Sequence, residues 1–288
     1  MAASLPDRAF PAGNAAPGDR VLAQLAAKNR TLVMGVLNVT PDSFSDGGHF
    51  FDPAAAIAHA KTLIAEGADI VDIGAESTRP YGGAVRVSAE EERRRLDPVL
   101  PNIVALGVPV SVDTMKAEVA GWALAAGAAI VNDVWGLQRD PDMAGVVAAH
   151  TAPIIIMHNR DAADPAIDIV ADVTAFFARS LEIAARAGIS RDRIVLDPGI
   201  GFGKTPEQSV ICIARLDAWR GFGAPLLIGA SRKRFIDWIA PAPPLQRLGG
   251  SLAAHLLAVE NGATLVRTHD VAPTVQALAV AAALKAAR

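Results

Sequence analysis

Polar and charged side chains stand at the ends of eight short apolar runs along the chain. Each end carries groups that can donate or accept hydrogen bonds, hold an anion or transfer a proton. They are Asn38, Asp72 with Glu76, Asp113, Asn132 with Asp133, His158, Asp197, Ser231 with Lys233, and Arg267 with His269. A single Asp or Asn in such a place can simply cap the next helix. Eight such ends together favour a site for a polar substrate with hydrogen-bonding groups and an anionic group.

The apolar runs are rich in Val, Ile and Leu and are bounded by Gly or Pro, which is typical of buried parallel strands. They cover residues 31–38, 69–74, 108–113, 129–133, 153–158, 193–197, 225–229 and 264–269. Stretches with helical apolar spacing separate them, for example 54–66, 89–106, 167–187 and 245–261. We expect Pro98 and Pro101 to kink or shorten the second of these helices.

This alternation predicts an α/β fold, a single eight-stranded parallel (β/α)8 TIM barrel with the active site at the carboxyl ends of the strands. We expect the barrel domain to cover residues 31–288 and residues 1–30 to form an N-terminal cap or a loose tail. An open doubly wound sheet is the alternative, and its dinucleotide-binding form needs a Gly-rich fingerprint after the first strand. The chain reads NVTP at 38–41 instead, which favours the barrel.

Composition narrows the class of protein. The 288 residues are 51% hydrophobic and 20% charged, with a net charge of -3, so the chain can bury a large core and has no strong positive field to recruit nucleic acid. No window has the roughly 18 uncharged apolar residues of a spanning helix, and the first thirty residues lack a secretory h-region. The single cysteine, Cys212, fits a reducing compartment. We expect a soluble cytoplasmic protein that binds neither nucleic acid nor a membrane.

Several common catalytic motifs are missing or broken. Residues 198–205 read PGIGFGKT, but Pro198 stands where a phosphate-binding loop needs its first Gly. The chain has no Gly-x-Ser-x-Gly elbow and no His-Glu-x-x-His helix, which argues against serine esterases and zinc hydrolases. His59, His150 and His255 fall in predicted helices or at their ends, where a packing or surface role is favoured.

One long segment resembles the signature of a known family. Residues 34–48 read MGVLNVTPDSFSDGG, which is similar to the dihydropteroate synthases, the pterin-binding barrels of folate biosynthesis. The resemblance continues through GAESTRP at 74–80, SVDT at 111–114, VND at 131–133, LDPG at 196–199, SRK at 231–233 and RTHD at 267–270. It spans the chain from Thr31 to its end and implies the same eight-stranded barrel.

The resemblance implies a transferase that condenses 6-hydroxymethyl-7,8-dihydropterin diphosphate with 4-aminobenzoate to give 7,8-dihydropteroate and pyrophosphate. It assigns pterin binding to Asp113, Asn132, Met157, Asp197, Phe202 and Lys233. Carboxylates would accept from the donors on the pterin edge, while Asn132 and Lys233 would serve its remaining groups.

By the same resemblance, the diphosphate contacts Asn38, Thr78, Arg267 and His269, and Asn38 supplies an oxygen toward a Mg²⁺ cofactor. The 4-aminobenzoate contacts Phe44, Thr78, Arg79, Pro80, Ser231 and Arg234. Asp46, Thr78 and Arg79 lie on two Gly-, Pro- and Ser-rich loops that would close over the reacting groups. The catalytic set implied is Asn38, Asp46, Arg79, Lys233, Arg267 and His269.

The family usually forms a homodimer through helices late in the barrel, so we expect a homodimer, with Leu252, Leu256 and Leu257 as core or interface residues. The chain departs from the family pattern at Asn159 and Arg160, where many members carry Met or Gln. Ala75 and Tyr81 replace common glycines, and Arg234 replaces a familiar serine.

Three other functions stay open at this stage. A related barrel that transfers a methyl group from methyltetrahydrofolate would share the pterin acids but not the full 42–48 loop or the SRK segment. A non-catalytic homologue that binds pterin phosphate would have no use for the two loops. A metal-dependent aldolase or lyase would explain the acids but not the signature at 34–48.

Overall fold

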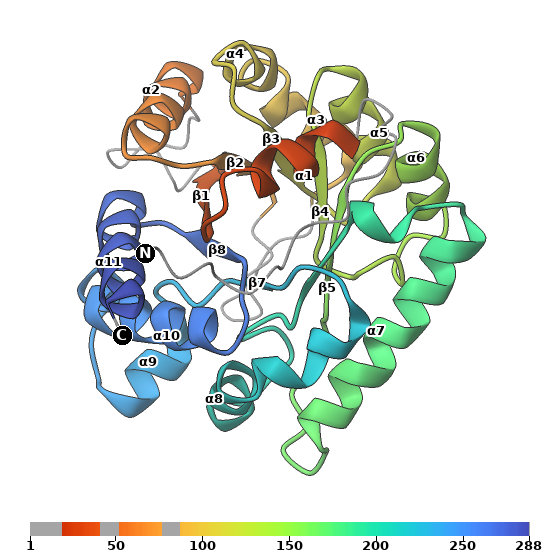
Figure 1. Cartoon of the computed structure of the whole chain (residues 1–288). Coiled ribbons are helices and arrows are strands. Elements are labelled where there is room, and N and C mark those ends of the chain that lie inside the picture. Colours follow the sequence, from red (N-terminus) through yellow and green to blue (C-terminus); the bar gives the residue numbers. More distant parts are fainter. Residues whose placement is uncertain (1–18, 41–51, 77–86, 288) are drawn as a thin grey trace.

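Eight parallel strands form the centre of the protein. The structure is a computed structural model, and it describes residues 19–40, 52–76 and 87–287 (Figure 1). The strands are β1 (Leu32–Asn38), β2 (Ile70–Gly74), β3 (Val110–Asp113), β4 (Ile130–Asp133), β5 (Ile154–Met157), β6 (Ile194–Asp197), β7 (Leu227–Ile228) and β8 (Leu265–Thr268). They pair in the order β6-β5-β4-β3-β2-β1-β8-β7, and a parallel bridge between Leu196 and Leu226 joins β6 to the start of β7. The predicted barrel is confirmed.

Helices follow the strands and surround them (Figure 1). They are α2 (Pro53–Ala65), α3 (Ala89–Leu96), α4 (Leu100–Val104), α5 (Ala117–Ala125), α6 (Met143–Ala149), α7 (Ile169–Arg186), α8 (Pro206–Ala214), α9 (Arg234–Ile239), α10 (Leu248–Glu260) and α11 (Val271–Ala286), with short 3₁₀ turns η1 (Arg191–Arg193), η2 (Leu216–Phe222) and η3 (Pro244–Gln246). Side-chain caps fix several starts: Asp52 begins α2, Asp168 begins α7, and Thr205 forms a capping box with Gln208 on α8. The predicted helix at 89–106 is two helices, because Pro98 and Pro101 interrupt it.

The barrel interior changes from apolar to polar along β2, β4, β6 and β8. Side chains two residues apart point to the same face of a strand. The inward positions therefore read Ile70 then Asp72 in β2, and Ile130 then Asn132 in β4. In the same way Val195 precedes Asp197 in β6, and Leu265 precedes Arg267 in β8. The inward positions of β5, Ile155 and Met157, are both apolar. The polar layer lies at the carboxyl ends, where sites of this fold are built.

A short helix covers the amino-terminal end of the barrel. In α1 (Asp19–Ala26), Leu22 and Leu25 are buried in one core cluster with the lower interior residues, Leu32 and Ile70 among them. Figure 1 shows this helix across one end of the strands. The carboxylate of Asp69 binds the guanidinium of Arg30 at 2.7 Å and accepts from the backbone N–H of Val33 at 2.9 Å. Residues 19–30 thus close the end of the barrel opposite to the polar layer.

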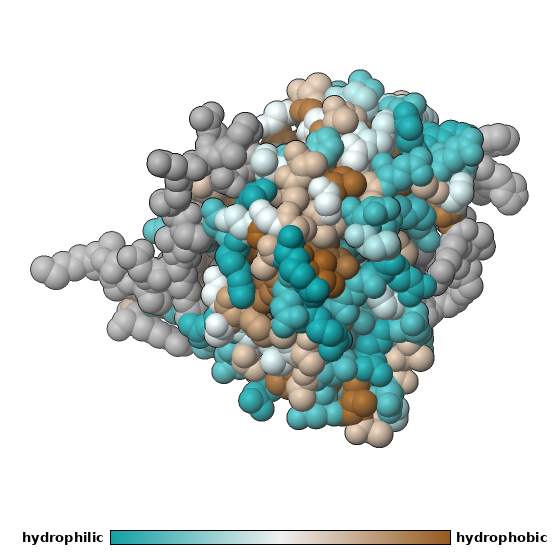
Figure 2. Space-filling model, turned by 90° about the vertical axis from the view of Figure 1, so that its right-hand side faces the viewer, coloured by the Kyte–Doolittle hydropathy of each residue, from teal (hydrophilic) through white to brown (hydrophobic). Residues whose placement is uncertain are grey.

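The outer layer is typical of barrel helices. The larger core cluster lies between the outward faces of the strands and the buried faces of the helices. Hydrophilic residues cover much of the face seen in Figure 2, with smaller hydrophobic areas among them. No helix in the described part of the chain is long and apolar enough to cross a membrane.

Candidate active site

A small cavity opens in the polar layer at the carboxyl ends of the strands. It is lined by Asp113, Asn132, Val134, Met157, Asp197, Ile200, Phe202, Gly229, Lys233 and Arg267. All six residues that the sequence predicted for pterin binding are among them. They come from β3, β4, β5, the end of β6 with its following loop, and the loop after β7. The structure therefore brings this predicted set together.

Arg267 is held in the cavity wall by two carboxylates. Its Nε donates to Asp72 Oδ2 at 2.7 Å, and its Nη2 donates to Asp113 Oδ2 at 2.9 Å. Burial disfavours the charge of this guanidinium, but the two carboxylates outweigh burial and raise the pKa of Arg267. Arg267 is therefore a fixed positive charge.

Two buried oxygens of the cavity lack a protein partner among the described residues. They are Asp113 Oδ1 and Asn132 Oδ1. The orientation of the Asn132 amide follows from its other end, since its Nδ2 donates to Asp72 Oδ2 at 3.3 Å. A buried acceptor without a donor is unfavourable by about 1 to 3 kcal/mol. Such atoms in a cavity wall are prepared for donors on a ligand.

The acids of the cavity are hard to ionise. Burial raises the pKa of Asp113 to about 7; the charge of Arg267 opposes that shift and the nearby Asp72 carboxylate adds to it. Burial also raises the pKa of Asp197, although this carboxylate accepts from the backbone N–H of Gly199 at 2.7 Å and lies near the charge of Lys233.

Lys233 carries an ammonium group whose charge the cavity weakens. Burial, together with the charge of Arg267, lowers the pKa of its ammonium group to about 7, while Asp197 opposes the shift. Its Nζ lies 4.1 Å from the centre of the Phe202 ring, within the range of a cation–π contact. A pKa near 7 allows Lys233 to donate a hydrogen bond as a cation or to accept one as an amine.

The loop before Lys233 has an unusual backbone. Arg232 has φ +59, a left-handed conformation that non-glycine residues seldom adopt. Three contacts hold it there: its N–H donates to Ser251 Oγ at 2.9 Å, its carbonyl accepts from Arg247 Nη1 at 3.1 Å, and its guanidinium binds both oxygens of Asp270. Strain held by such contacts is typical of functional loops. Here it sets the direction in which the next residue, Lys233, enters the cavity.

His269 lies beside this loop at the end of β8. Ser231 Oγ accepts from the His269 backbone N–H at 3.2 Å and lies 3.0 Å from its Nδ1. Burial and the positive charges of Arg267, Arg232 and Lys233 lower the pKa of the imidazole to about 3. His269 is therefore neutral at pH 7.

The other predicted residues differ in how far the structure places them. Asn38 ends β1, in register with Gly74 of β2, and is half-buried at the same end of the barrel. Arg234 is the first residue of α9 and is exposed. Phe44, Asp46, Thr78, Arg79 and Pro80 lie outside the described residues.

Three residues at polar strand ends, Glu76, Asp133 and His158, do not line the cavity. The carboxylate of Glu76 binds the ammonium group of Lys116. His158 is fully buried, and its ring lies between Lys204 and Asp172 instead of lining the cavity. Asp133 accepts from the backbone N–H groups of Trp135 and Leu137, so it shapes the turn after β4. These residues bind other parts of the protein, and none of them lines the cavity.

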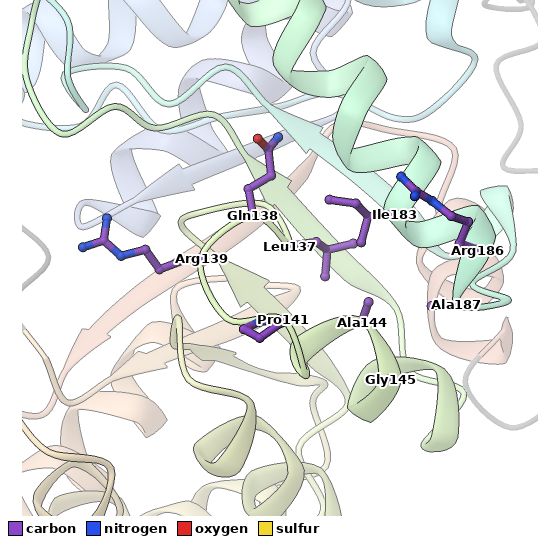
Figure 3. Close-up of a pocket in the computed structure, with 9 residues that line it drawn as sticks. All are labelled: Leu137, Gln138, Arg139, Pro141, Ala144, Gly145, Ile183, Arg186 and Ala187. Carbon is purple, nitrogen blue, oxygen red and sulfur yellow. The ribbon is translucent and has the colours of Figure 1, made fainter.

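A larger hollow lies elsewhere. Its volume is about 620 Å³, and it sits on the outside of the barrel between the turn after β4, α6 and α7 (Figure 3). Leu137 and Ile183 lie between Arg139 and Arg186, which stand toward its two ends (Figure 3). None of the predicted site residues lines this hollow.

Comparison with known proteins shows the family of the chain. Residues 34–269 match the family model of the pterin binding enzymes. The chain is 48% identical to the dihydropteroate synthase of Bacillus subtilis over 86% of this chain and 86% of that protein. The chain belongs to the dihydropteroate synthases.

Solved structures of this family agree with the fold. The dihydropteroate synthase of Xanthomonas albilineans with 4-aminobenzoic acid superposes with a TM-score of 0.85 at 47% identity, over 89% of this chain and 93% of that one. A second structure of that synthase, in complex with 7,8-dihydropteroate, has a TM-score of 0.81 at 45% identity, over 89% and 94%. The fold of this chain is therefore that of solved dihydropteroate synthases.

Sequence reasoning did not assign a role to Asp72. Its carboxylate is fully buried and holds both Arg267 and Asn132 from the floor of the cavity. The signal for it was a charged residue on the inward face of an otherwise apolar strand. Lys204 was also missed, because the local sequence does not show that its ammonium group is buried beside His158.

Proposed function

We propose that this chain condenses 6-hydroxymethyl-7,8-dihydropterin diphosphate with 4-aminobenzoate at the cavity. The C–O bond between the pterin methylene and the diphosphate breaks, a C–N bond to the arylamine forms, and the amine loses a proton. Pyrophosphate and 7,8-dihydropteroate are the products. The observation that carries the proposal is the pair of buried oxygens without protein donors, Asp113 Oδ1 and Asn132 Oδ1, in a cavity that Lys233 and Arg267 also line.

The pterin ring fits this distribution of groups. Its amino and ring N–H groups would donate to Asp113, Asn132 and Asp197, and Lys233 would donate to its carbonyl and ring nitrogen acceptors. Met157 and Phe202 pack in one apolar cluster beside the cavity and would contact the faces of the ring.

The diphosphate would lie beside Arg267 and His269. Arg267 uses Nε and Nη2 for Asp72 and Asp113, which leaves Nη1 for a phosphate oxygen. A Ser231 hydroxyl that donates to Nδ1 of the neutral His269 leaves Nε2–H to donate to a second oxygen. Thr78 would complete this set from outside the described residues. These donors stabilise charge as it builds on the departing pyrophosphate.

A magnesium ion fits the donor set only together with the substrate. Within 19–40, 52–76 and 87–287, no group of three or more His, Cys, Asp or Glu side chains is placed to hold a metal ion. Mg²⁺ commonly keeps several waters and binds through substrate phosphates with one or two protein oxygens. We propose that Asn38 supplies such an oxygen. The ion would neutralise negative charge on the diphosphate.

The 4-aminobenzoate would bind beside the loop after β7. Ser231 and Arg234 flank the start of α9, and the backbone N–H groups there suit a carboxylate. Phe44, Thr78, Arg79 and Pro80 would form the remaining walls, with Asp46 closing the first loop over the reacting groups. These five residues lie outside the described part of the chain.

We also propose a homodimer in the cytoplasm. Every large hydrophobic side chain that is exposed among the described residues belongs to the last third of the chain. They are Ile211, Trp238, Ile239, Leu245, Leu257, Val280 and Leu284. Apolar side chains gathered on late elements support an interface there. The free buried thiol of Cys212 is consistent with a reducing compartment.

The test is a product assay. Purified protein is incubated with the pterin diphosphate, 4-aminobenzoate and Mg²⁺, and pyrophosphate and dihydropteroate are measured together. We expect both products in equal amounts, with neither from Lys233→Ala. Tight binding of the pterin diphosphate without either product would overturn the synthase in favour of a binding protein. Failure to bind the pterin diphosphate would overturn the whole assignment.

A further inference from the structure

A fully buried lysine stands behind the cavity and has no part in the mechanism above. Lys204 is 1% exposed and lies in the loop that joins β6 to α8. Its Nζ is 2.6 Å from His158 Nδ1 and donates to the carbonyl of Phe202 at 3.1 Å. A buried ammonium group is strongly unfavourable unless it is paired and hydrogen-bonded. The partners of Lys204 therefore matter.

The contacts continue from Lys204 to the surface of α7. His158 Nε2 lies 2.9 Å from Asp172 Oδ2, and Arg160 Nη1 donates to Asp172 Oδ1 at 2.8 Å. Burial and the charge of Lys204 lower the pKa of His158 to about 3, and burial lowers the pKa of Lys204 to about 8. At pH 7 the imidazole is neutral, so its Nδ1 accepts from the ammonium group and its Nε2–H donates to the Asp172 carboxylate.

Two glycines allow the same loop to approach the segment after β5 closely, because they have no side chain. Gly199 has φ +67, and a Cβ on it would lie 2.0 Å from the carbonyl oxygen of His158. Gly203 has φ +53, and a Cβ on it would lie 2.4 Å from Cβ of Arg160. The backbone between them carries Phe202 into the cavity. The loop therefore fits its neighbour closely at both ends, with Lys204 directly after the second contact.

We propose that Lys204, His158 and Asp172 form a buried brace that positions the 198–203 loop for pterin binding. Lys204 acts on the site through the carbonyl of Phe202, whose ring lies over Nζ of Lys233. Its partner His158 packs against Gly199, and the Gly199 N–H donates to the Asp197 carboxylate. Lys204 is thus a positioning residue that touches no substrate. This inference rests on the proposed pterin site.

The test compares Lys204→Met with its parent and with Asp69→Asn. Methionine keeps most of the length and removes the ammonium group. Asp69→Asn removes a buried charge that is paired at the opposite end of the barrel. The readouts are the Kd for the pterin diphosphate, the KM for 4-aminobenzoate and the melting temperature. We expect Lys204→Met to raise the Kd about tenfold, because Phe202 and Asp197 would no longer be held in place for the pterin ring. The KM for 4-aminobenzoate should change less than about twofold.

Asp69→Asn should lower the melting temperature and leave the Kd unchanged. A Lys204→Met protein that melts lower but binds the pterin diphosphate like its parent would overturn the brace and leave a purely structural lysine. If Lys204→Met does not fold, Asp172→Ala decides, because this residue is half-buried on a helix where alanine is well tolerated. We expect Asp172→Ala to raise the Kd severalfold, and an unchanged Kd in that folded variant overturns the brace.

Failure of the brace differs from failure of the proposed function. A parent protein that does not bind the pterin diphosphate contradicts the pterin site itself. A parent that binds it while both variants bind equally well contradicts only the brace. As an independent check, the imidazole nitrogens of His158 should show the Nε2–H tautomer by nuclear magnetic resonance at pH 7, and the Nδ1–H tautomer would contradict the proton arrangement that the brace requires.

Discussion

At the scale of single residues, the cavity works through atoms that the protein leaves unsatisfied. One carboxylate oxygen of Asp113 accepts a hydrogen bond from Arg267. The other oxygen has no partner among the described residues. The same holds for the amide oxygen of Asn132, whose nitrogen is anchored on Asp72. A ligand that donates to both oxygens removes an existing penalty as well as forming new hydrogen bonds. This is a physical reason for strong and oriented pterin binding.

Replacement of Asp113 by Asn tests that reason. We expect Asp113→Asn to weaken binding of the pterin diphosphate by about tenfold to a hundredfold, because a hydrogen bond to a charged group is worth about 1.5 to 3 kcal/mol. Isothermal titration calorimetry measures the change. Asp161→Asn is the matched control, since Asp161 is an exposed carboxylate paired with Arg139 on the outside of the barrel. Equal affinities in both variants would contradict the role of Asp113.

The pH dependence of pterin binding follows from two groups. The pKa of Asp113 is raised to about 7, so its carboxylate is lost as the pH falls below that value. The pKa of Lys233 is lowered to about 7, so its ammonium group is lost as the pH rises above it. We expect affinity to be greatest near pH 7 and to fall on both sides. Binding isotherms between about pH 5 and pH 9 measure this profile. The Lys233→Met variant should lose the alkaline limb, and a parent profile without that limb would refute the role of the ammonium group.

The sequence predicted a site residue correctly where its place at the end of an apolar strand was sufficient evidence. Asp113, Asn132 and Asp197 end apolar strands, and that position alone pointed to the mouth of the barrel. Asp72 and Lys204 were not assigned, because their roles depend on partners far away in the chain. Arg267 is 195 residues from Asp72, and His158 is 46 residues from Lys204. Only the closed barrel brings these pairs together.

At the scale of elements, the loop after β6 is the part of the site with the least freedom to change. The left-handed Gly199 packs against the carbonyl of His158, where a methyl group has no room. Its neighbour Asp197 ends the strand and accepts from the Gly199 N–H. The conformation of this loop thus determines where a carboxylate and an aromatic ring enter the cavity.

Replacement of Gly199 by Ala tests this packing. We expect the Gly199→Ala protein to lose about 1 to 3 kcal/mol of unfolding free energy from overpacking, with weaker pterin binding in addition. Chemical denaturation measures the first and calorimetric titration the second. Gly188→Ala is the matched control, because Gly188 also has a positive φ, +81, but no atom within 4 Å of an added Cβ. Unchanged pterin affinity in Gly199→Ala would contradict the link between loop packing and binding.

Most helices and strands were predictable from the sequence, and the exception has a physical cause. All eight strands lie within the predicted runs, because apolar runs between Gly and Pro mark buried strands whatever their partners. The break between α3 and α4 was predictable from its prolines. The helix at 19–26 was not, since it is short and its two buried leucines gain their stability from the barrel end that they cover.

At the scale of the whole molecule, the two ends of the barrel have separate tasks. The amino-terminal end is closed by α1 and the ion pairs of Asp69, and the carboxyl end carries the polar cavity. Leu22→Ala should therefore lower the unfolding free energy by about 2 to 5 kcal/mol, the usual result of removing a buried leucine side chain. Pterin affinity should stay the same. Chemical denaturation and calorimetric titration of one preparation check both statements, and a loss of affinity in the folded variant would show that the ends are coupled.

The proposed homodimer is a second property of the whole molecule. Leu257 on α10 and Trp238 on α9 are both large, apolar and about half exposed. We expect Leu257→Glu to shift the protein from dimer toward monomer, because a charge in the centre of an apolar interface loses its hydration. Sedimentation velocity measures the mass. The same measurement on Leu284→Glu, near the end of α11, shows whether that end of the helix also belongs to the dimer interface. A parent protein that sediments as a monomer at micromolar concentration would contradict the proposed dimer.

The central claim is that the cavity at the carboxyl ends of the strands binds the pterin ring. The most direct test is a crystal structure of the protein soaked with the dihydropterin diphosphate and Mg²⁺. We expect pterin N–H groups within hydrogen-bond distance of Asp113 Oδ1 and Asn132 Oδ1, and the diphosphate beside Arg267 and His269. A pterin ring bound instead in the outer hollow between α6 and α7, or turned so that these two oxygens stay without donors, would contradict the account.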